Sequence, residues 1–126
     1  RDMNIPYIRL PEMYLIRAEA RARTGNEAGA IEDLMTIRRR GNPAAADVTA
    51  TGQALLDEIM TEKRIELCFE GHRLWELMRH QMSVVRNDCT APANACTITY
   101  PDPRFVLPIP QNELDANPNI TQNPGY

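Results

Sequence analysis

The stretch EKRIELCFEGHR, Glu62 to Arg73, decides the fold. Its helical pattern carries acids at three successive i, i+4 positions, which are Glu62, Glu66 and Glu70. This spacing stacks the three side chains on one side of a helix, and that side is also the apolar face. Because leaving a buried carboxylate unpaired costs several kcal/mol, the acidic row needs cationic partners from neighbouring elements.

Arginines in the rest of the chain are the expected partners of this row. Arg38 projects from the middle of the apolar stripe of the preceding segment, where a guanidinium is hard to solvate. Paired carboxylates can also perform general acid–base catalysis, but the excess of arginine within reach favours a structural role. We therefore predict a structural ion network whose members are Arg17, Arg38, Glu62, Glu66, Glu70 and Arg73.

Length and composition indicate one domain, residues 1–126, with a modest core. The net charge is −3 and charges of both signs are mixed, which argues against a nucleic-acid-binding protein. No stretch approaches the roughly 20 apolar residues of a spanning helix, and the N-terminus has neither a signal core nor a lipidation cysteine. Because the chain lacks an initiator methionine, we expect it to be part of a longer protein.

The three cysteines lie in two different settings. Cys68 falls within the helical core pattern and is predicted to be a small buried apolar residue. Cys89 and Cys96 lie in a polar loop, where an oxidising compartment would let them pair and stabilise the fold by about 2–3 kcal/mol. No second CxxC or histidine cluster accompanies them, so no zinc site is predicted.

The chain in order predicts an all-α fold. Residues 8–40 form a helical hairpin, because two helical patterns are separated only by a turn at Gly25 and Asn26. Residues 53–80 form a long third helix, which Gly71 kinks near residue 70. A polar loop over residues 81–104 and an extended, Pro-rich tail over residues 105–126 complete the chain.

The first helix, residues 9–24, is apolar nearly all round and needs neighbours on more than one side. The spacing of Ala18, Gly25, Ala30 and Ile31 is similar to that of one tetratricopeptide unit, whose small residues let two helices approach closely. Such units bury their faces by stacking. If this is a C-terminal piece, the side of the first helix opposite the second should therefore be an exposed apolar patch.

Five motifs, in order, resemble the C-terminal part of the SusD/RagB family. They are RLPEMYLIRAEARARTG at residues 9–25, IRRR at 37–40, EKRIELCFEGHRLWELMR at 62–79, LPIPQNEL at 107–114 and QNPGY at 122–126. Each motif alone is weak evidence for the family. The combination of EGHR with LPIP and a QNPGY terminus is specific.

The resemblance implies a surface lipoprotein of the Bacteroidetes outer membrane, built on tetratricopeptide-like helix pairs and anchored through a lipid outside this segment. Such proteins cap a TonB-dependent transporter and bind glycans or other nutrients, without catalysis or a cofactor. The family has Asp where this chain has Glu76, which puts one local contact in doubt. The resemblance carries over these scaffold positions: Glu19, Arg38, Glu62, Glu66, Glu70, Gly71, Arg73 and Arg79.

Two other functions compete with this interpretation. A metal enzyme would rely on His72, Glu76 and His80, which share one helix face, but no common catalytic motif accompanies them. A generic tetratricopeptide-type protein-interaction module would share the fold and bind a peptide instead. The Pro-rich tail favours the SusD/RagB family, because an adaptor has no need of it.

Glycan binding calls for exposed aromatic rings with amide or acidic side chains nearby. Tyr100, with Asn94 and Asn87 in the polar loop, is the candidate that the sequence offers. The residues that contact ligands in the family form no motif, so the resemblance places none of them on this sequence. The aromatic residues predicted for the core are Trp75, Phe69, Tyr14 and Phe105.

Overall fold

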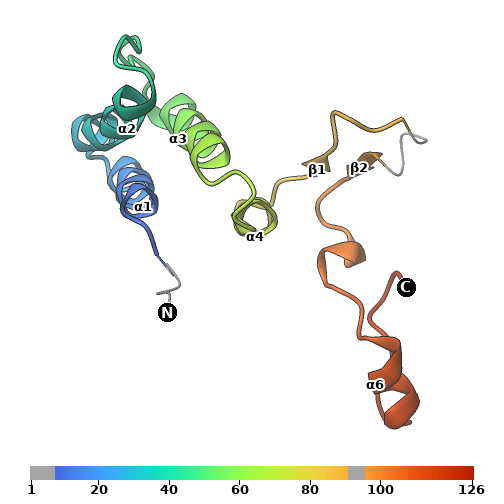
Figure 1. The fold of residues 1–126 in the computed structure, drawn as a ribbon. Helices are drawn as coiled ribbons and strands as arrows, with labels where there is room; N and C mark the ends of the chain where they lie inside the picture. The colour runs from blue at the N-terminus through green and yellow to red at the C-terminus, as the bar shows by residue number, and fades with distance from the viewer. Residues whose placement is uncertain (1–7, 91–95) are drawn as a thin grey trace, which may run out of the picture. The chain divides into compact units, whose positions relative to one another are not determined.

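The computed structural model describes residues 8–90 and 96–126 and divides the chain into two compact units, one ending at His72 and one starting at Arg73. The predicted all-α class is confirmed, since helices dominate both the first unit and the start of the second (Figure 1). No helix in the described part of the chain is long and apolar enough to cross a membrane. The described residues contain the helices α1 (Leu10–Arg23), α2 (Glu27–Gly41), α3 (Gly52–Glu66), α4 (His72–Arg79) and α6 (Gln111–Ala116).

The predicted helical hairpin is formed by α1 and α2, which pack against each other. The turn between them uses Gly25 with φ +84°, a conformation that suits glycine because it has no Cβ. The side chain of Asn26 then accepts a hydrogen bond from Gly29 N at 3.1 Å and caps the start of α2. A short turn with a defined cap therefore fixes where the second helix begins.

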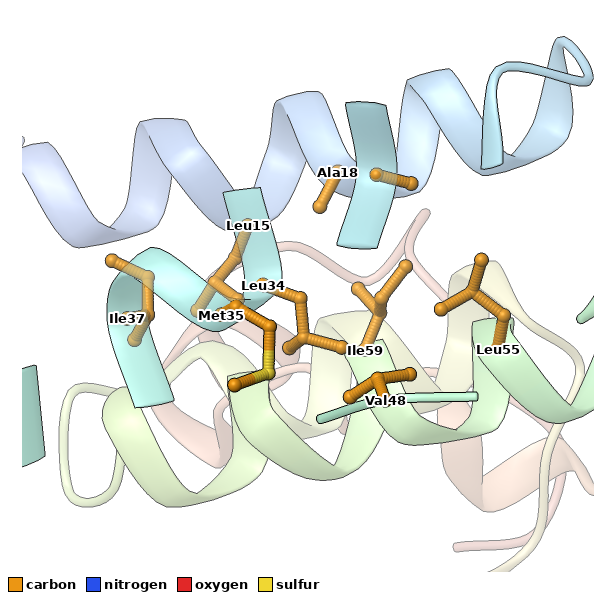
Figure 2. Packing of buried hydrophobic residues seen from close by; sticks show 9 residues of the cluster. Leu15, Ala18, Leu34, Met35, Ile37, Val48, Leu55 and Ile59 are labelled. Atoms are coloured by element: carbon orange, nitrogen blue, oxygen red, sulfur yellow. The ribbon is translucent and has the colours of Figure 1, made fainter. Parts of the chain in front are cut away.

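The core of the first unit lies between α1, α2 and α3 (Figure 2). Ala18 of α1 and Ala30 of α2 are fully buried, and their small side chains allow the two helices to approach closely. Larger apolar side chains from all three helices fill the remaining space. The other members of the cluster are Leu15, Leu34, Met35, Ile37, Val48, Leu55 and Ile59.

The third helix ends earlier than predicted. The pattern extended it to residue 70, but α3 stops at Glu66 and residues 67–71 form a turn. Phe69 and Gly71 have φ values of +64° and +79°, in the left-handed region that ends helices. Periodicity could not reveal this stop, because Phe69 adopts a conformation that phenylalanine rarely takes.

The second unit contains a small antiparallel pair of strands within the predicted loop. Strand β1 (Val84–Val85) pairs with β2 (Thr97–Ile98), so that Val84 lies opposite Ile98 and Val85 opposite Thr97. Two residues per strand are too few to show an alternating pattern in the sequence. The polar loop prediction therefore missed this pair.

The tail over residues 105–126 is mostly extended, as predicted, with a 3-10 turn η1 (Pro103–Phe105) before it and only the six-residue α6 within it. Residues 122–126, here termed the returning tail, fold back along residues 104–109. Gln122 accepts a hydrogen bond from Ile109 N at 2.8 Å and donates one to Ile109 O at 3.0 Å. The further bonds are Asn123 Nδ2 to Leu107 O at 2.7 Å and the Tyr126 hydroxyl to Arg104 O at 3.3 Å.

Candidate functional site

Arg38 pairs with the start of the acidic row. Its Nε donates to Glu62 Oε2 at 2.8 Å, and its Nη1 donates to Glu58 Oε2 at 2.6 Å. The side chains of Arg38 and Glu62 are only 21% and 12% exposed. Burial favours the neutral guanidine, but the hydrogen bonds to Glu62 and Glu58 outweigh burial and raise the pKa of Arg38. The structure thus brings these predicted partners together and adds Glu58.

Glu66 and Glu70 are held by arginines that the prediction did not include. Arg9, directly before α1, bonds the Glu66 carboxylate and donates from Nε to Glu70 Oε2 at 2.9 Å. Arg40, near the end of α2, donates to Glu66 Oε2 at 2.6 Å. The hydrogen bond from Arg9 lowers the pKa of Glu70. The sequence could not supply these partners, because they depend on how the ends of three helices align.

Arg17 does not join the acidic row, which corrects the prediction. It makes a bidentate contact with Asp33 of α2, from Nε to Oδ2 at 2.9 Å and from Nη2 to Oδ1 at 2.7 Å. Arg21 adds a third bond to Asp33 Oδ2 at 2.9 Å. Asp33 is 2% exposed. Asp33 stands three residues after Ala30 and therefore on the apolar side of its helix, so its spacing alone indicates a buried acid in need of a partner.

Glu19, one of the scaffold positions, lies in a second buried ion pair. Lys63 Nζ donates to Glu19 Oε2 at 2.6 Å, and both side chains are almost fully buried. Arg23 Nε donates to the other oxygen of Glu19 at 2.9 Å. Lys63 was not predicted as a partner of Glu19.

The last predicted member of the network, Arg73, lies exposed in α4 of the second unit. Its place in the network stays a prediction. Each glutamate of the acidic row has a guanidinium within hydrogen-bond distance. Carboxylates held in this way fit a structural role better than proton transfer.

The residues of the metal-enzyme alternative contact acids in different places. His80 Nε2 lies 3.7 Å from Glu76 Oε2, and His72 Nδ1 lies 3.8 Å from Glu12 Oε1. Glu76 also accepts a hydrogen bond from Arg79 at 2.9 Å. Glu76 and His80 thus lie close together, as the spacing predicts, whereas His72 lies beside Glu12.

Cys89 and Cys96 form a disulfide, with their Cα atoms 5.5 Å apart. The bond closes the connection between β1 and β2, and residues 91–95 of that connection lie outside the described residues. The second cysteine leads directly into β2. The disulfide therefore fixes both ends of this loop next to the strand pair.

We expect peptide mapping of the unreduced protein to recover Cys89 and Cys96 in one linked peptide and Cys68 as an alkylated thiol. Replacing both loop cysteines by serine should lower the free energy of unfolding by about 2–3 kcal/mol, because the unfolded chain regains the freedom of an open loop. Cys68→Ser is the matched control and should leave stability unchanged. Three alkylatable thiols in protein from its native source would contradict the prediction.

Three apolar residues predicted for the core are exposed instead. Cys68 and Phe69 lie in the turn after α3 and point to solvent, and the predicted helical face does not extend to them. Trp75 is 62% exposed on α4. Phe105 is buried, and Tyr14 is partly buried against the core of the first unit, so the core prediction is right for two of the four aromatic residues.

The residues predicted to contact a ligand differ in how exposed their side chains are. Tyr100 is half-buried, and its ring packs edge-on against Phe105 with 5.5 Å between centroids. Its backbone N–H donates to Ser83 Oγ at 3.1 Å, which ties it to the start of the strand pair. Asn87 is exposed in the turn after β1, whereas Asn94 lies outside the described residues.

The SusD family model, named SusD_RagB, matches residues 1–126. The chain belongs to the SusD family. This membership agrees with the positions that the motifs brought together, since Glu19, Arg38, Glu62, Glu66 and Glu70 all lie in ion pairs of the first unit. The scaffold role of these pairs stays a prediction.

Two curated SusD-family proteins and one solved structure are similar to the chain over nearly its whole length. The starch-binding protein SusD of Bacteroides thetaiotaomicron is 34% identical, covering 99% of this chain and 22% of that protein. The SusD-like protein P38 of Formosa agariphila is 31% identical, covering 99% of this chain and 25% of that protein. A crystal structure of a putative sugar binding protein from Bacteroides vulgatus is 38% identical with a TM-score of 0.77, covering 97% of this chain and 29% of that chain.

Proposed function

We propose that the chain is a non-catalytic part of a cell-surface protein that binds glycans or other nutrients and works with a TonB-dependent outer-membrane transporter. The observation that carries the proposal is the 34% identity to a starch-binding protein across 99% of the chain. The solved relative described as a putative sugar binding protein supports the same class of ligand. Because the chain spans only about a quarter of the curated relatives, it supplies part of the activity.

Within such a protein, the first unit acts as scaffold. Several of its charged side chains are engaged in ion pairs between α1, α2 and α3, which makes those groups less suited to bind sugar hydroxyls. The second unit offers more suitable groups, because sugars stack their apolar C–H faces on exposed rings. Trp75 has an exposed ring and joins Tyr100, Asn87 and Asn94 as a proposed ligand contact.

A location at the surface of the outer membrane follows from the same family membership. The disulfide between Cys89 and Cys96 supports it, because such bonds persist in oxidising compartments. The lipid anchor and signal peptide would lie outside this chain. Co-purification of a TonB-dependent transporter with the tagged protein from solubilised outer membranes would test the partnership, and repeated recovery of the protein alone would count against it.

Affinity electrophoresis in gels containing starch or another soluble polysaccharide tests the binding function. The intact protein should be retarded by at least one glycan, with no release of reducing ends. Trp75→Ala should weaken that retardation by about tenfold, the size expected for loss of a buried aromatic contact. Val85→Ala, at another exposed apolar residue of the second unit, is the control and should behave as the wild type.

Two outcomes would contradict the proposal. Free migration of folded protein through every polysaccharide gel would exclude the glycan class tested. Release of reducing ends on incubation would mean that the protein is an enzyme. Unchanged retardation of the Trp75→Ala variant would remove only Trp75 from the proposed contacts, and Tyr100→Ala and Asn87→Ala would then be compared in the same gel.

A further inference from the structure

The pair of strands β1 and β2 has little of its own to hold it together. Each strand contributes two residues, and one further backbone hydrogen bond, from Arg86 N to Cys96 O at 2.9 Å, extends the pairing. Of the four strand residues, one is exposed and none is fully buried. A two-stranded hairpin is only marginally stable in water even when it is longer. Another part of the second unit must therefore support this pair.

The disulfide supplies that support at one end of the pair. Cys96 directly precedes β2, and Cys89 lies a few residues after β1. Without the bond, pairing of the strands would have to close the whole connection over residues 86–96, and this closure costs chain entropy. With the bond, the unfolded chain has already lost most of that freedom. The disulfide thus favours the paired state of β1 and β2.

Tyr100 is tied to the other end of the pair. Ser83 directly precedes β1, and its Oγ accepts a hydrogen bond from Tyr100 N at 3.1 Å. The Tyr100 ring packs edge-on against the buried Phe105. The contact with Phe105 orients the ring, whereas the bond to Ser83 fixes the backbone from which the ring projects. The position of that backbone therefore depends on the strand pair.

We propose that the disulfide between Cys89 and Cys96 is a redox-sensitive positioning element for Tyr100. While it is intact, the strand pair keeps Ser83 bonded to Tyr100 N. Its reduction lets the pair open, releases the Tyr100 backbone and weakens ligand binding. The inference rests on the proposed function, in which Tyr100 is a ligand contact.

Reduction of the bond takes a dithiol as co-reactant. One thiolate of the dithiol attacks a sulfur of the disulfide and forms a mixed disulfide, and the second thiolate then displaces the protein sulfur. Two electrons and two protons pass to the protein, so that Cys89 and Cys96 become thiols and the reagent becomes a cyclic disulfide. Asp88 and Thr90, which flank Cys89, are exposed, so a small dithiol can reach the bond.

Hydrogen exchange tests the positioning directly. The protein is labelled in deuterated buffer before and after reduction by dithiothreitol, and peptides covering residues 83–86 and 97–100 are followed by mass spectrometry. Their amides should exchange at least about tenfold faster after reduction, because the strand pair opens more often. Helix α2 of the first unit is the internal control and should exchange unchanged. The double variant Cys89→Ser, Cys96→Ser should exchange fast with or without the dithiol.

A further variant keeps the disulfide and removes the bond to Tyr100. Ser83→Ala deletes the Oγ acceptor, so the peptide that ends at Tyr100 should exchange faster although the disulfide is intact. Thr99→Ala, which removes an exposed hydroxyl from the same segment, is the matched control and should exchange as the wild type. Equal exchange of the two variants would overturn the path from the strand pair to Tyr100.

Affinity electrophoresis measures the consequence for binding. In a gel whose glycan retards the oxidised protein, reduction should weaken the retardation about fivefold, and Tyr100→Ala should do the same. Reduction of the Tyr100→Ala variant should add nothing, because both changes remove one contact. Unchanged exchange after reduction would overturn the proposal, and so would faster exchange with full retardation. If no glycan retards the oxidised protein, the proposed function fails, whereas the exchange rates still decide whether the disulfide positions Tyr100.

Discussion

Replacing Asp33 by asparagine is expected to lower the free energy of unfolding by about 3 kcal/mol, which would be among the largest single effects in this chain. Asp33 is almost fully buried and accepts three hydrogen bonds from Arg17 and Arg21. Asparagine keeps the volume, so no cavity forms. The loss therefore measures the charged hydrogen bonds, and denaturant unfolding followed by far-UV circular dichroism would record it.

Asp47→Asn is the matched control for this experiment. Asp47 also pairs with an arginine, Arg39, but the two side chains are 78% and 53% exposed. Exposed pairs contribute little, so this variant should stay within about 0.5 kcal/mol of the wild type. Equal losses in the two aspartate variants would show that burial of Asp33 adds nothing, and the geometry of its three bonds would have no energetic meaning.

Replacing Arg38 by methionine should cost about 2–3 kcal/mol, because Glu62 loses its guanidinium partner in a poorly solvated position. Methionine retains the length and apolar contact of the arginine stem. The same variant with Glu62→Leu added should recover much of the loss, since a well-packed apolar pair often replaces a buried ion pair at little cost. Equilibrium unfolding of the wild type, the two single variants Arg38→Met and Glu62→Leu, and the double variant gives the coupling energy between positions 38 and 62.

The adjacent residue supplies the control for Arg38. Arg39→Met removes an arginine from the same helix, but its partner Asp47 is well solvated, so a change below about 0.5 kcal/mol is expected. If Arg38→Met also changed stability by less than that amount, the acidic row would not depend on its cation. The interpretation of the row as a structural network would then fail.

Sequence reasoning located Glu62, Glu66 and Arg38 because each projects from the apolar face of its own helix. That property depends only on local spacing. Glu70 was placed on the same face wrongly, since it lies exposed in the turn after α3. The partners Arg9 and Arg40 lie at helix ends, and local spacing does not encode how those ends align. Asp33 lies within α2 and was visible as an acid on its apolar face.

Cys68 and Phe69 are exposed for a single local reason. The prediction continued the helix to residue 70, but the left-handed conformation at Phe69 ends the regular geometry on which any face depends. Ligand contacts were beyond sequence reasoning for another reason. Rings and amides that hold a sugar need no fixed spacing along the chain, so Tyr100 and Asn87 could be proposed only from composition.

The returning tail sets an order in which the second unit can be completed. Residues 104–109 leave the ribosome before residues 122–126, yet the main-chain groups of Leu107 and Ile109 bond to the side chains of Asn123 and Gln122. Until position 123 has been made, water must take the place of those partners. A nonsense codon at position 122 would therefore remove both side chains and leave an earlier segment unable to close.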